Sequence, residues 1–223
     1  MIVVAPLARS PQLERLLAAT GVPVHAARPA GLAPSTTVTV VLGDAEPGPT
    51  PASLVHEAPG VRLLVLSRLG AHPDARTATL RRLWRLEEDA RATGVPTLTL
   101  RLAPVVGPDA PLWARLATRT ALPGQGRRLV DPVHRDDVVT TLVRAFAEPS
   151  WGTEWYEVAG AERFSWAELA EAARLGPRAT VSPAWEPSLD EIAEHRLAES
   201  EPWASRFGIV PTSVSAWARA GVA

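Results

Sequence analysis

The sequence contains no cysteine, no lysine and no asparagine, and the first two absences exclude whole classes of chemistry. Without cysteine there is no disulfide, no thiol nucleophile and no thiolate metal site. All 23 basic residues are arginines, so no lysine can form a Schiff base, anchor a phosphate or lower the pKa of a neighbouring tyrosine. Tyr156 is the single tyrosine. Covalent catalysis by cysteine or lysine is therefore excluded.

Long apolar runs and a surplus of positive charge are also missing. No run approaches the roughly 20 residues that span a bilayer, so no membrane partner is expected. The net charge of −1 gives no support for binding nucleic acid. The first residues, MIVVAPLARS, lack the features of a signal peptide and are better explained as a first strand, so we expect a cytoplasmic protein. No pair of histidines has metal-ligand spacing, so no structural metal is expected. The sequence leaves a homodimer open.

What is present is the composition of a globular protein, with 46% hydrophobic and 21% charged residues in 223. Short apolar runs alternate with segments of helical periodicity. Strands are expected over residues 1–5, 22–26, 37–42, 61–67, 97–102, 130–134 and 155–158, and helices over 12–20, 52–58, 74–93, 111–120, 135–147, 166–173, 188–200 and 213–220.

This alternation predicts an α/β fold, a reduced Rossmann-like, doubly wound parallel sheet with a small C-terminal cap. Residues 1–107 form the Rossmann-like core, which continues through the elements of 130–158. Residues 108–223 mainly form the cap, which we expect over the carboxyl edge of the sheet.

The β-α-β unit of residues 61–107 is the first place to look for a site, because ligands of open α/β sheets bind at the carboxyl ends of strands. Ser67 lies at such an end, as a substrate-orienting hydroxyl or as a residue bonded to local backbone. His72 follows in a loop, as a general base or as an ordinary exposed histidine. Asp74 is expected to cap the long helix. The three acids 87–89 are expected on a solvated face.

Five segments in order carry a family likeness: RLLVLSRLGAHPD, ATGVPTLTLRLAPVVGP, DPVHRDDVVTTLVRAF, YEVAGAERFSWAELAEAA and RFGIVPTSVSAWARA. Together they resemble the extended and atypical short-chain dehydrogenase/reductases, which are Rossmann-fold proteins that include nucleotide-sugar epimerases and NmrA-like proteins. The resemblance implies NAD or NADP across the sheet, a serine after the fourth full-length strand, and a Tyr-x-x-x-Lys pair on the next helix. It also implies a small C-terminal domain that binds a small-molecule substrate.

Cofactor-binding positions are expected where the strands end. They are Ala5, Pro6, Leu7 and Arg9 in the turn after the first strand, Arg28 after the second, Gly43 after the third, and Arg101. Arg28 has a solvent-facing alternative, and Arg101 has an internal salt bridge as its alternative.

Three departures weaken the likeness. The first turn, APLARSP, has no glycine to let the backbone approach a pyrophosphate. The segment between residues 28 and 37 is too short for the usual helix and strand, so one β-α unit is missing at the adenosine edge. The expected tyrosine and lysine positions fall near Thr79 and Leu83, and neither residue replaces them by role.

A second group of candidates is His134 and Asp136, where an imidazole next to carboxylates could form an acid/base site. The alternative is that Asp136 or Asp137 caps the helix that begins there. Tryptophans 113, 151, 155 and 185 are expected in the cap, as packing residues or as the lining of an apolar pocket.

Two hypotheses of function follow. The first is a divergent oxidoreductase or epimerase relative, working with NAD(P) and a different acid or without a cofactor, with Ser67, His72, His134 and Asp136 as its catalytic residues. The second is a non-catalytic dinucleotide or metabolite sensor, or a structural subunit, on the same scaffold.

Overall fold

A computed structural model describes residues 2–4, 11–25, 37–43, 50–56, 60–119, 121–180 and 195–221. The chain divides into two compact units. Unit 1 is Met1–Arg101 with Val139–Tyr156, and unit 2 is Leu102–Val138 with Glu157–Ala223. Each unit is described by itself below.

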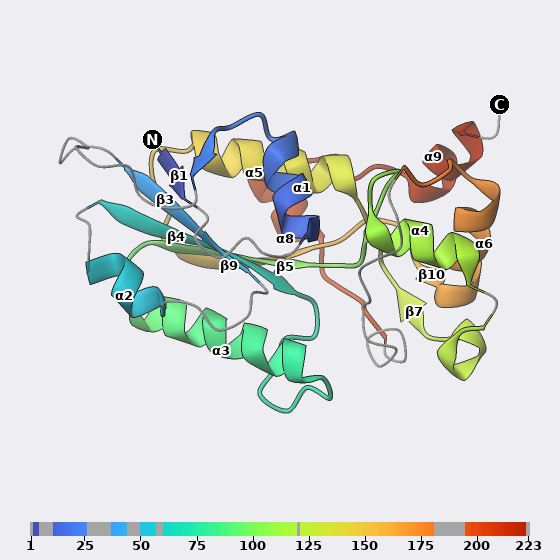
Figure 1. Ribbon diagram of the computed structural model, residues 1–223, viewed down its shortest axis with the longest axis horizontal. Helices are drawn as coiled ribbons and strands as arrows, with labels where there is room; N and C mark the ends of the chain where they lie inside the picture. Colours follow the sequence, from blue (N-terminus) through green and yellow to red (C-terminus); the bar gives the residue numbers. More distant parts are fainter. Residues whose placement is uncertain are drawn as a thin grey trace. The chain divides into compact units, whose positions relative to one another are not determined.

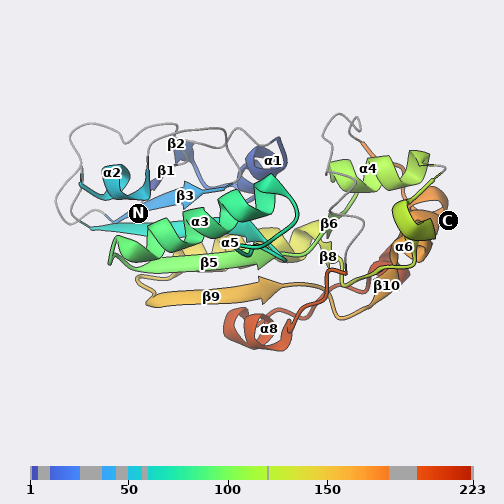
Figure 2. The same ribbon diagram turned by 90° about the horizontal axis from the view of Figure 1, so that it is seen from below.

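The sheet of unit 1 has the strand order β2-β1-β3-β4-β5-β9. The pairs β1–β2, β1–β3 and β3–β4 are parallel, and β5 and β9 lie side by side (Figure 2). Among the described residues, β2-β1-β3-β4-β5 correspond to strands 2-1-4-5-6 of the Rossmann order 3-2-1-4-5-6, and β9 is added beyond the last of them. The strands are β1 (Ile2–Val4), β2 (Val24–His25), β3 (Val38–Leu42), β4 (Val61–Arg68), β5 (Thr97–Leu102) and β9 (Thr153–Val158).

Helices cover both faces of this sheet. Figure 1 shows α2 (Pro51–His56) and α3 (Ala78–Ala92) on one face, and α1 (Pro11–Ala19) and α5 (Arg135–Ala147) on the other. Strand side chains alternate between the faces. On the first face, alternate residues of β3 and β4 pack against both helices in one apolar cluster of Val38, Val40, Leu42, Val61, Leu63, Val65 and Ala90, with Leu54, Val55, Leu86 and Val95 at its margin.

The opposite face holds a buried arginine, Arg62, which is 3% exposed. Its Nε donates to Thr39 Oγ1 over 2.7 Å. Its two other nitrogens donate to the carbonyls of Phe146 and Glu148, at 3.2 and 2.6 Å, where α5 ends. The ring of Trp151 lies 3.8 Å from its guanidinium carbon. Arg62 therefore joins β4 to the carboxyl end of α5.

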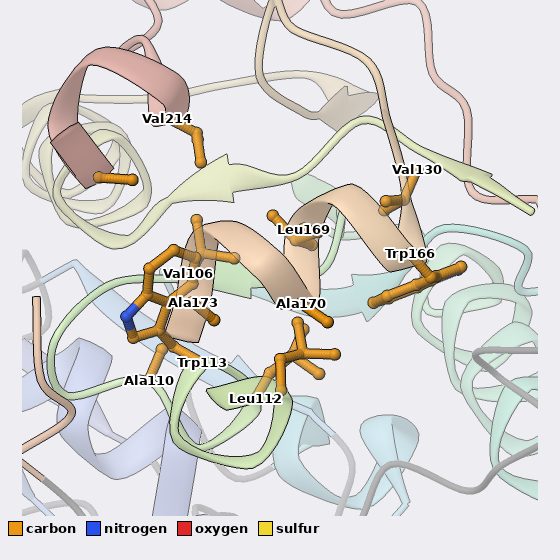
Figure 3. Packing of buried hydrophobic residues seen from close by; sticks show 12 residues of the cluster. Val106, Ala110, Leu112, Trp113, Val130, Trp166, Leu169, Ala170, Ala173 and Val214 are labelled. Carbon is orange, nitrogen blue, oxygen red and sulfur yellow. The ribbon is translucent and has the colours of Figure 1, made fainter. Parts of the chain in front are cut away.

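Unit 2 is built from short strands and helices around one apolar cluster. Strand β6 (Val105–Val106) pairs with β8 (Val133–His134) in parallel, and β7 (Leu129–Val130) pairs with β10 (Phe164–Ser165) antiparallel. The helices are α4 (Pro111–Thr118), the 3-10 turn η1 (Pro123–Gly126), α6 (Trp166–Leu175), α8 (Glu201–Phe207) and α9 (Val214–Ala220). Figure 3 shows this cluster, in which the side chains of Trp113, Trp166 and Leu169 are almost fully buried.

Most predicted elements are present, and the capping box of Ser165 and Glu168 at the start of α6 is confirmed. Three expectations are wrong. Asp74 does not cap the long helix, because Thr77 does, accepting from Leu80 N. The strand expected over 130–134 is two strands in different sheets. Residues 195–200 are not helical, and the next helix, α8, was not foreseen.

In the parts of the chain that the structure describes, no helix combines the length and the apolar composition that crossing a membrane requires.

Candidate functional site

The carboxyl edge of the unit 1 sheet is the first candidate site. The strand order reverses between β1 and β3, since β2 lies on one side of β1 and β3, β4 and β5 lie on the other. Such a switch point is where open α/β sheets bind ligands. The register pairs Leu42 with Val65. Gly43, which follows β3, and Ser67, near the end of β4, therefore lie at the same edge of neighbouring strands. The structure therefore brings two of the predicted residues together.

Ser67 is the residue of this edge with the clearest chemical signal. It is 1% exposed, and its Oγ has no hydrogen-bond partner among the described residues. The local backbone bond offered as its alternative is therefore not found in that part of the chain. Ser67 shares the face of Val65, which is the face that α3 covers. A buried hydroxyl without a partner costs about 1–3 kcal/mol, so it calls for an explanation such as a ligand.

His72 lies five residues further on, in the loop that follows β4, and its side chain is 64% exposed. Its Nδ1 accepts a hydrogen bond from Asp74 N at 3.2 Å, so the ring proton of the neutral form is on Nε2. Asp74 itself is exposed, with an Oδ2 atom 3.9 Å from the imidazole. His72 is thus oriented by its own loop, and its Nε2–H is the group left free to donate a hydrogen bond.

The helix positions that the resemblance gives to tyrosine and lysine are occupied by Thr79 and Leu83. Leu83 is 2% exposed and packs with Ala71 and Leu80. Thr79 accepts a long hydrogen bond from Arg82 Nη2 at 3.5 Å. Neither side chain can lower the pKa of a phenol or transfer a proton to substrate. Proton transfer at this edge must therefore use other groups.

Arg101 is partly buried and paired with an acid of α3. Its Nε and Nη2 donate to both carboxylate oxygens of Glu87 at 2.6–3.2 Å, and Trp155 lies 4.9 Å from its guanidinium carbon. The salt bridge offered as its alternative is confirmed, and we leave Arg101 out of the proposed cofactor site. Glu87 is 1% exposed, so the expectation of a solvated face was wrong for this acid. The buried carboxylate needs this partner, because an unpaired charge in the interior is costly.

The remaining cofactor-binding predictions, Ala5, Pro6, Leu7, Arg9 and Arg28, lie outside the described residues.

His134 and Asp136 form the second candidate site, which belongs to unit 2. His134 ends β8 and is 4% exposed. Its Nδ1 accepts from the backbone N–H of Asp136 at 3.3 Å, so the imidazole itself satisfies one of the free N–H groups of α5. Asp136 Oδ2 lies 3.7 Å from the same nitrogen. The imidazole, and not a carboxylate, is the group found in this capping position.

Burial is the main reason that the pKa of His134 lies below its ordinary value, and Arg135 acts in the same direction. Three carboxylates, those of Asp136, Asp137 and Asp109, oppose the shift. The neutral ring carries its proton on Nε2, which is buried without a partner among the described residues, and its edge meets the ring of Trp217 at 4.8 Å between centroids. His134 is therefore a neutral N–H donor and not a general base.

Two further acids surround this histidine. Asp109 Oδ2 pairs with Arg135 Nε at 3.1 Å, and Asp109 was not foreseen, although it follows a short buried strand by three residues. Asp137 accepts from Thr212 N and Oγ1, both at 2.8 Å, and thereby fixes the segment that leads into α9. Asp137 is therefore a structural residue of unit 2.

The tryptophans expected in the cap fall in different places. Trp113 is fully buried in unit 2, where it donates to the carbonyl of Pro177 and packs on Trp217. Trp151 and Trp155 belong to unit 1, so their placement in the cap was wrong. Trp185 lies outside the described residues. A groove of about 420 Å³ in unit 2, between α6 and α9, has Phe164 as its aromatic lining residue and none of these tryptophans.

No group of three or more histidine, aspartate or glutamate side chains that could hold a metal ion occurs among the residues described by the structure.

The parallel sheet, its switch point and its layers of helices define a Rossmann fold, as the sequence predicted. No family model and no curated protein matches the chain. Solved structures do match the chain. MoeE5 in complex with UDP-glucose and NAD is similar over 100% of this chain and 97% of its own, with 17% identity and a TM-score of 0.67.

Two other solved structures are similar over almost their whole length. The NAD-dependent NDP-hexosamine 5,6-dehydratase TunA, involved in tunicamycin biosynthesis, is 18% identical with a TM-score of 0.64, over 99% of this chain and 96% of its own. The UDP-glucose 4-epimerase of Thermotoga maritima is 14% identical with a TM-score of 0.57, over 99% and 97%. The chain therefore shares its fold with these three proteins.

Proposed function

We propose that this chain binds NAD or NADP, together with a small organic ligand of the nucleotide-sugar type, and acts as a divergent oxidoreductase or epimerase. The carboxyl ends of β1, β3 and β4 are the binding edge. The observation that carries the proposal is the buried hydroxyl of Ser67 at this edge, which has no hydrogen-bond partner among the described residues. Two of the similar structures hold UDP-glucose, one of them together with NAD.

The residues present fit binding better than the usual proton transfer. Bound NAD(P) would supply a hydride donor or acceptor. The Ser67 hydroxyl would donate to an oxygen of the ligand and so orient it. His72, with Nδ1 accepting a hydrogen bond within its own loop, carries its hydrogen on Nε2 and would donate a hydrogen bond to the ligand from there. Thr79 and Leu83 leave no tyrosine-lysine pair for proton transfer.

The test is a titration of the full chain with NADH and NADPH, each with and without UDP-glucose, followed by tryptophan fluorescence and calorimetry. Saturable binding is expected. Ser67→Ala should weaken binding of the sugar nucleotide about 5–10-fold, since one hydrogen bond contributes about 1 kcal/mol. Ser53→Ala is the control, because its exposed hydroxyl donates to the carbonyl of Thr50, just before α2. No binding at millimolar cofactor would sink the proposal.

Ser67→Ala should weaken ligand binding but should not weaken the stability of the unliganded protein. Ser67→Ala removes a buried hydroxyl without a partner, so the free energy of unfolding should stay the same or rise by up to about 1 kcal/mol. The comparison is Thr39→Val, which deletes a buried hydroxyl that Arg62 uses and should cost about 1.5–3 kcal/mol. Urea unfolding measures both. Equal losses in the two variants would mean that Ser67 is an ordinary structural serine.

A further inference from the structure

Arg128 and His195 are far apart in the sequence but are held together by backbone pairing in unit 2. Arg196 N donates to Leu129 O at 2.8 Å, and Asp131 N donates to Arg196 O at 2.9 Å. These two bonds add the segment at Arg196 to β7 as a further, parallel partner at Val130. The imidazole of His195 is therefore placed beside the start of β7 by the fold, and not by a chance side-chain contact.

The hydrogen bonds of the imidazole determine where its proton lies. Leu129 N donates to His195 Nδ1 at 3.0 Å. A neutral imidazole has one acceptor nitrogen, so Nδ1 is that acceptor and Nε2 carries the hydrogen. His195 Nε2 is 3.2 Å from Arg128 Nη1. The guanidinium is always protonated and has donors only. Two N–H donors therefore face each other with no acceptor between them.

Both side chains are exposed, and no carboxylate among the described residues pairs with either of them. Arg127, also exposed, is the preceding residue, so the start of β7 carries two adjacent positive charges. The neighbouring acid at the start of α6, Glu168, is already used by Ser165 N and Oγ at 2.7 and 2.8 Å. Positive charge is thus concentrated here without local neutralisation in that part of the chain.

The turn that leads into the arginines is tight and strained. Gly124, Gln125 and Gly126 have φ values of +57°, +57° and +68°. Gln125 is the one residue other than glycine with positive φ in the described part of the chain. A Cβ at Gly126 would lie 2.8 Å from Ala167 N, so glycine is required there. Non-glycine residues in this region cost about 1 kcal/mol or more and persist where the surrounding structure holds them, commonly at binding sites.

We propose that Arg128 and His195 bind a phosphate-type oxyanion. One oxygen would accept from His195 Nε2–H and the same or a second oxygen from the Arg128 guanidinium, which converts two opposed donors into a two-point clamp. The site uses residues of unit 2 and no residue of the Ser67 edge. Whether this site binds an oxyanion therefore does not depend on whether the chain binds a dinucleotide.

The test uses inorganic phosphate and pyrophosphate as probes on the full chain, with chloride at matched ionic strength as reference. Imidazole ¹⁵N spectra should first show the hydrogen of neutral His195 on Nε2. Either probe should then shift the Nε2–H signal saturably. Arg128→Ala and His195→Ala should each weaken binding at least tenfold, with unchanged circular dichroism. Arg174→Ala, which removes an exposed arginine from the end of α6, is the matched control and should have no effect.

Three results would overturn the proposal. The first is a hydrogen of His195 on Nδ1, which makes Nε2 an ordinary acceptor for Arg128. The second is a response of the signal to chloride as strong as its response to phosphate. The third is an Arg174→Ala variant that weakens binding as much as Arg128→Ala, which would indicate a general effect of charge. Loss of NADH binding with retained phosphate binding would reject the proposed function alone.

Discussion

His134 acts as a helix cap that works only in its neutral form. Its Nδ1 accepts the Asp136 N–H at the start of α5, and burial lowers the pKa of the imidazole despite the nearby carboxylates of Asp109, Asp136 and Asp137. Protonation would remove the acceptor and place a positive charge at the positive end of the helix dipole. The folded state therefore binds this proton less readily than the unfolded chain, in which histidine has a pKa of about 6.5.

The sign of the pH effect follows. Stability from this group is complete above about pH 6.5 and is lost as the pH falls below that value through the lowered pKa of the folded state. His134→Gln keeps an acceptor for the Asp136 N–H but does not titrate. Between about pH 7.5 and pH 5.5 the wild type should therefore lose about 1 kcal/mol more stability than this variant, the usual size of a cap.

Urea unfolding at a series of pH values measures the difference. His72→Gln is the matched control, because His72 makes the same contact with the N–H two residues on, but is exposed. Parallel pH profiles for wild type and His134→Gln would show that the cap does not depend on the charge of the ring.

At the scale of elements, Arg62 links the sheet to α5 in a way that no apolar residue could reproduce. Its fork donates to two carbonyls at the end of the helix, where the helix dipole is negative. Arg62→Met keeps most of the side-chain volume but leaves these carbonyls and Thr39 without their donor. We expect a loss of about 2–4 kcal/mol, since each orphaned buried group costs about 1–3 kcal/mol.

Thermal unfolding by circular dichroism tests this expectation. Arg62→Lys should lie between wild type and Arg62→Met, because an ammonium keeps the charge but not the planar fork. Arg68→Met, on the same strand and face at its other end, is the comparison for the loss of an arginine. If Arg62→Met lowers the melting temperature no more than Arg68→Met does, the contacts of Arg62 with α5 do not contribute specifically to stability.

Element boundaries show what the sequence could and could not predict. The strands of 61–67 and 97–102 were found because continuous apolar runs mark buried parallel strands. The start of α3 was misplaced because Asp74 and Thr77 are both good caps, and the choice between them depends on the turn that His72 and Ala75 form. The helix α8 was missed because Pro202 hides its periodicity, although proline is favoured in the first turn.

The candidate site was only partly predictable for a similar reason. Ser67 could be chosen from its place at a strand end, but that its hydroxyl lacks a partner follows from packing. Arg101 and Glu87 are 14 residues apart and meet because β5 lies beside the helix that carries Glu87. The contact of Arg128 with His195 joins residues 67 apart and has no local signal at all.

At the scale of the whole molecule, the chain crosses between the two units three times, at residues 101–102, 138–139 and 156–157. Each crossing falls inside or at the end of a regular element, since β5, α5 and β9 all contain residues of both units. A flexible linker would let the units unfold separately, but a continuous strand or helix cannot lose its order in one unit without losing hydrogen bonds in the other. We therefore expect one cooperative transition.

Calorimetry tests this directly, because a two-state transition has equal calorimetric and van't Hoff enthalpies. Arg62→Met disturbs unit 1. Glu162→Gln disturbs unit 2, where the carboxylate accepts from Ser213 Oγ and from Ser215 N and Oγ ahead of α9. Each variant should lower the same single transition temperature. Two separate transitions, with each variant lowering the transition temperature of only one, would show instead that the units unfold independently. The elements that run through both units would then not couple their unfolding.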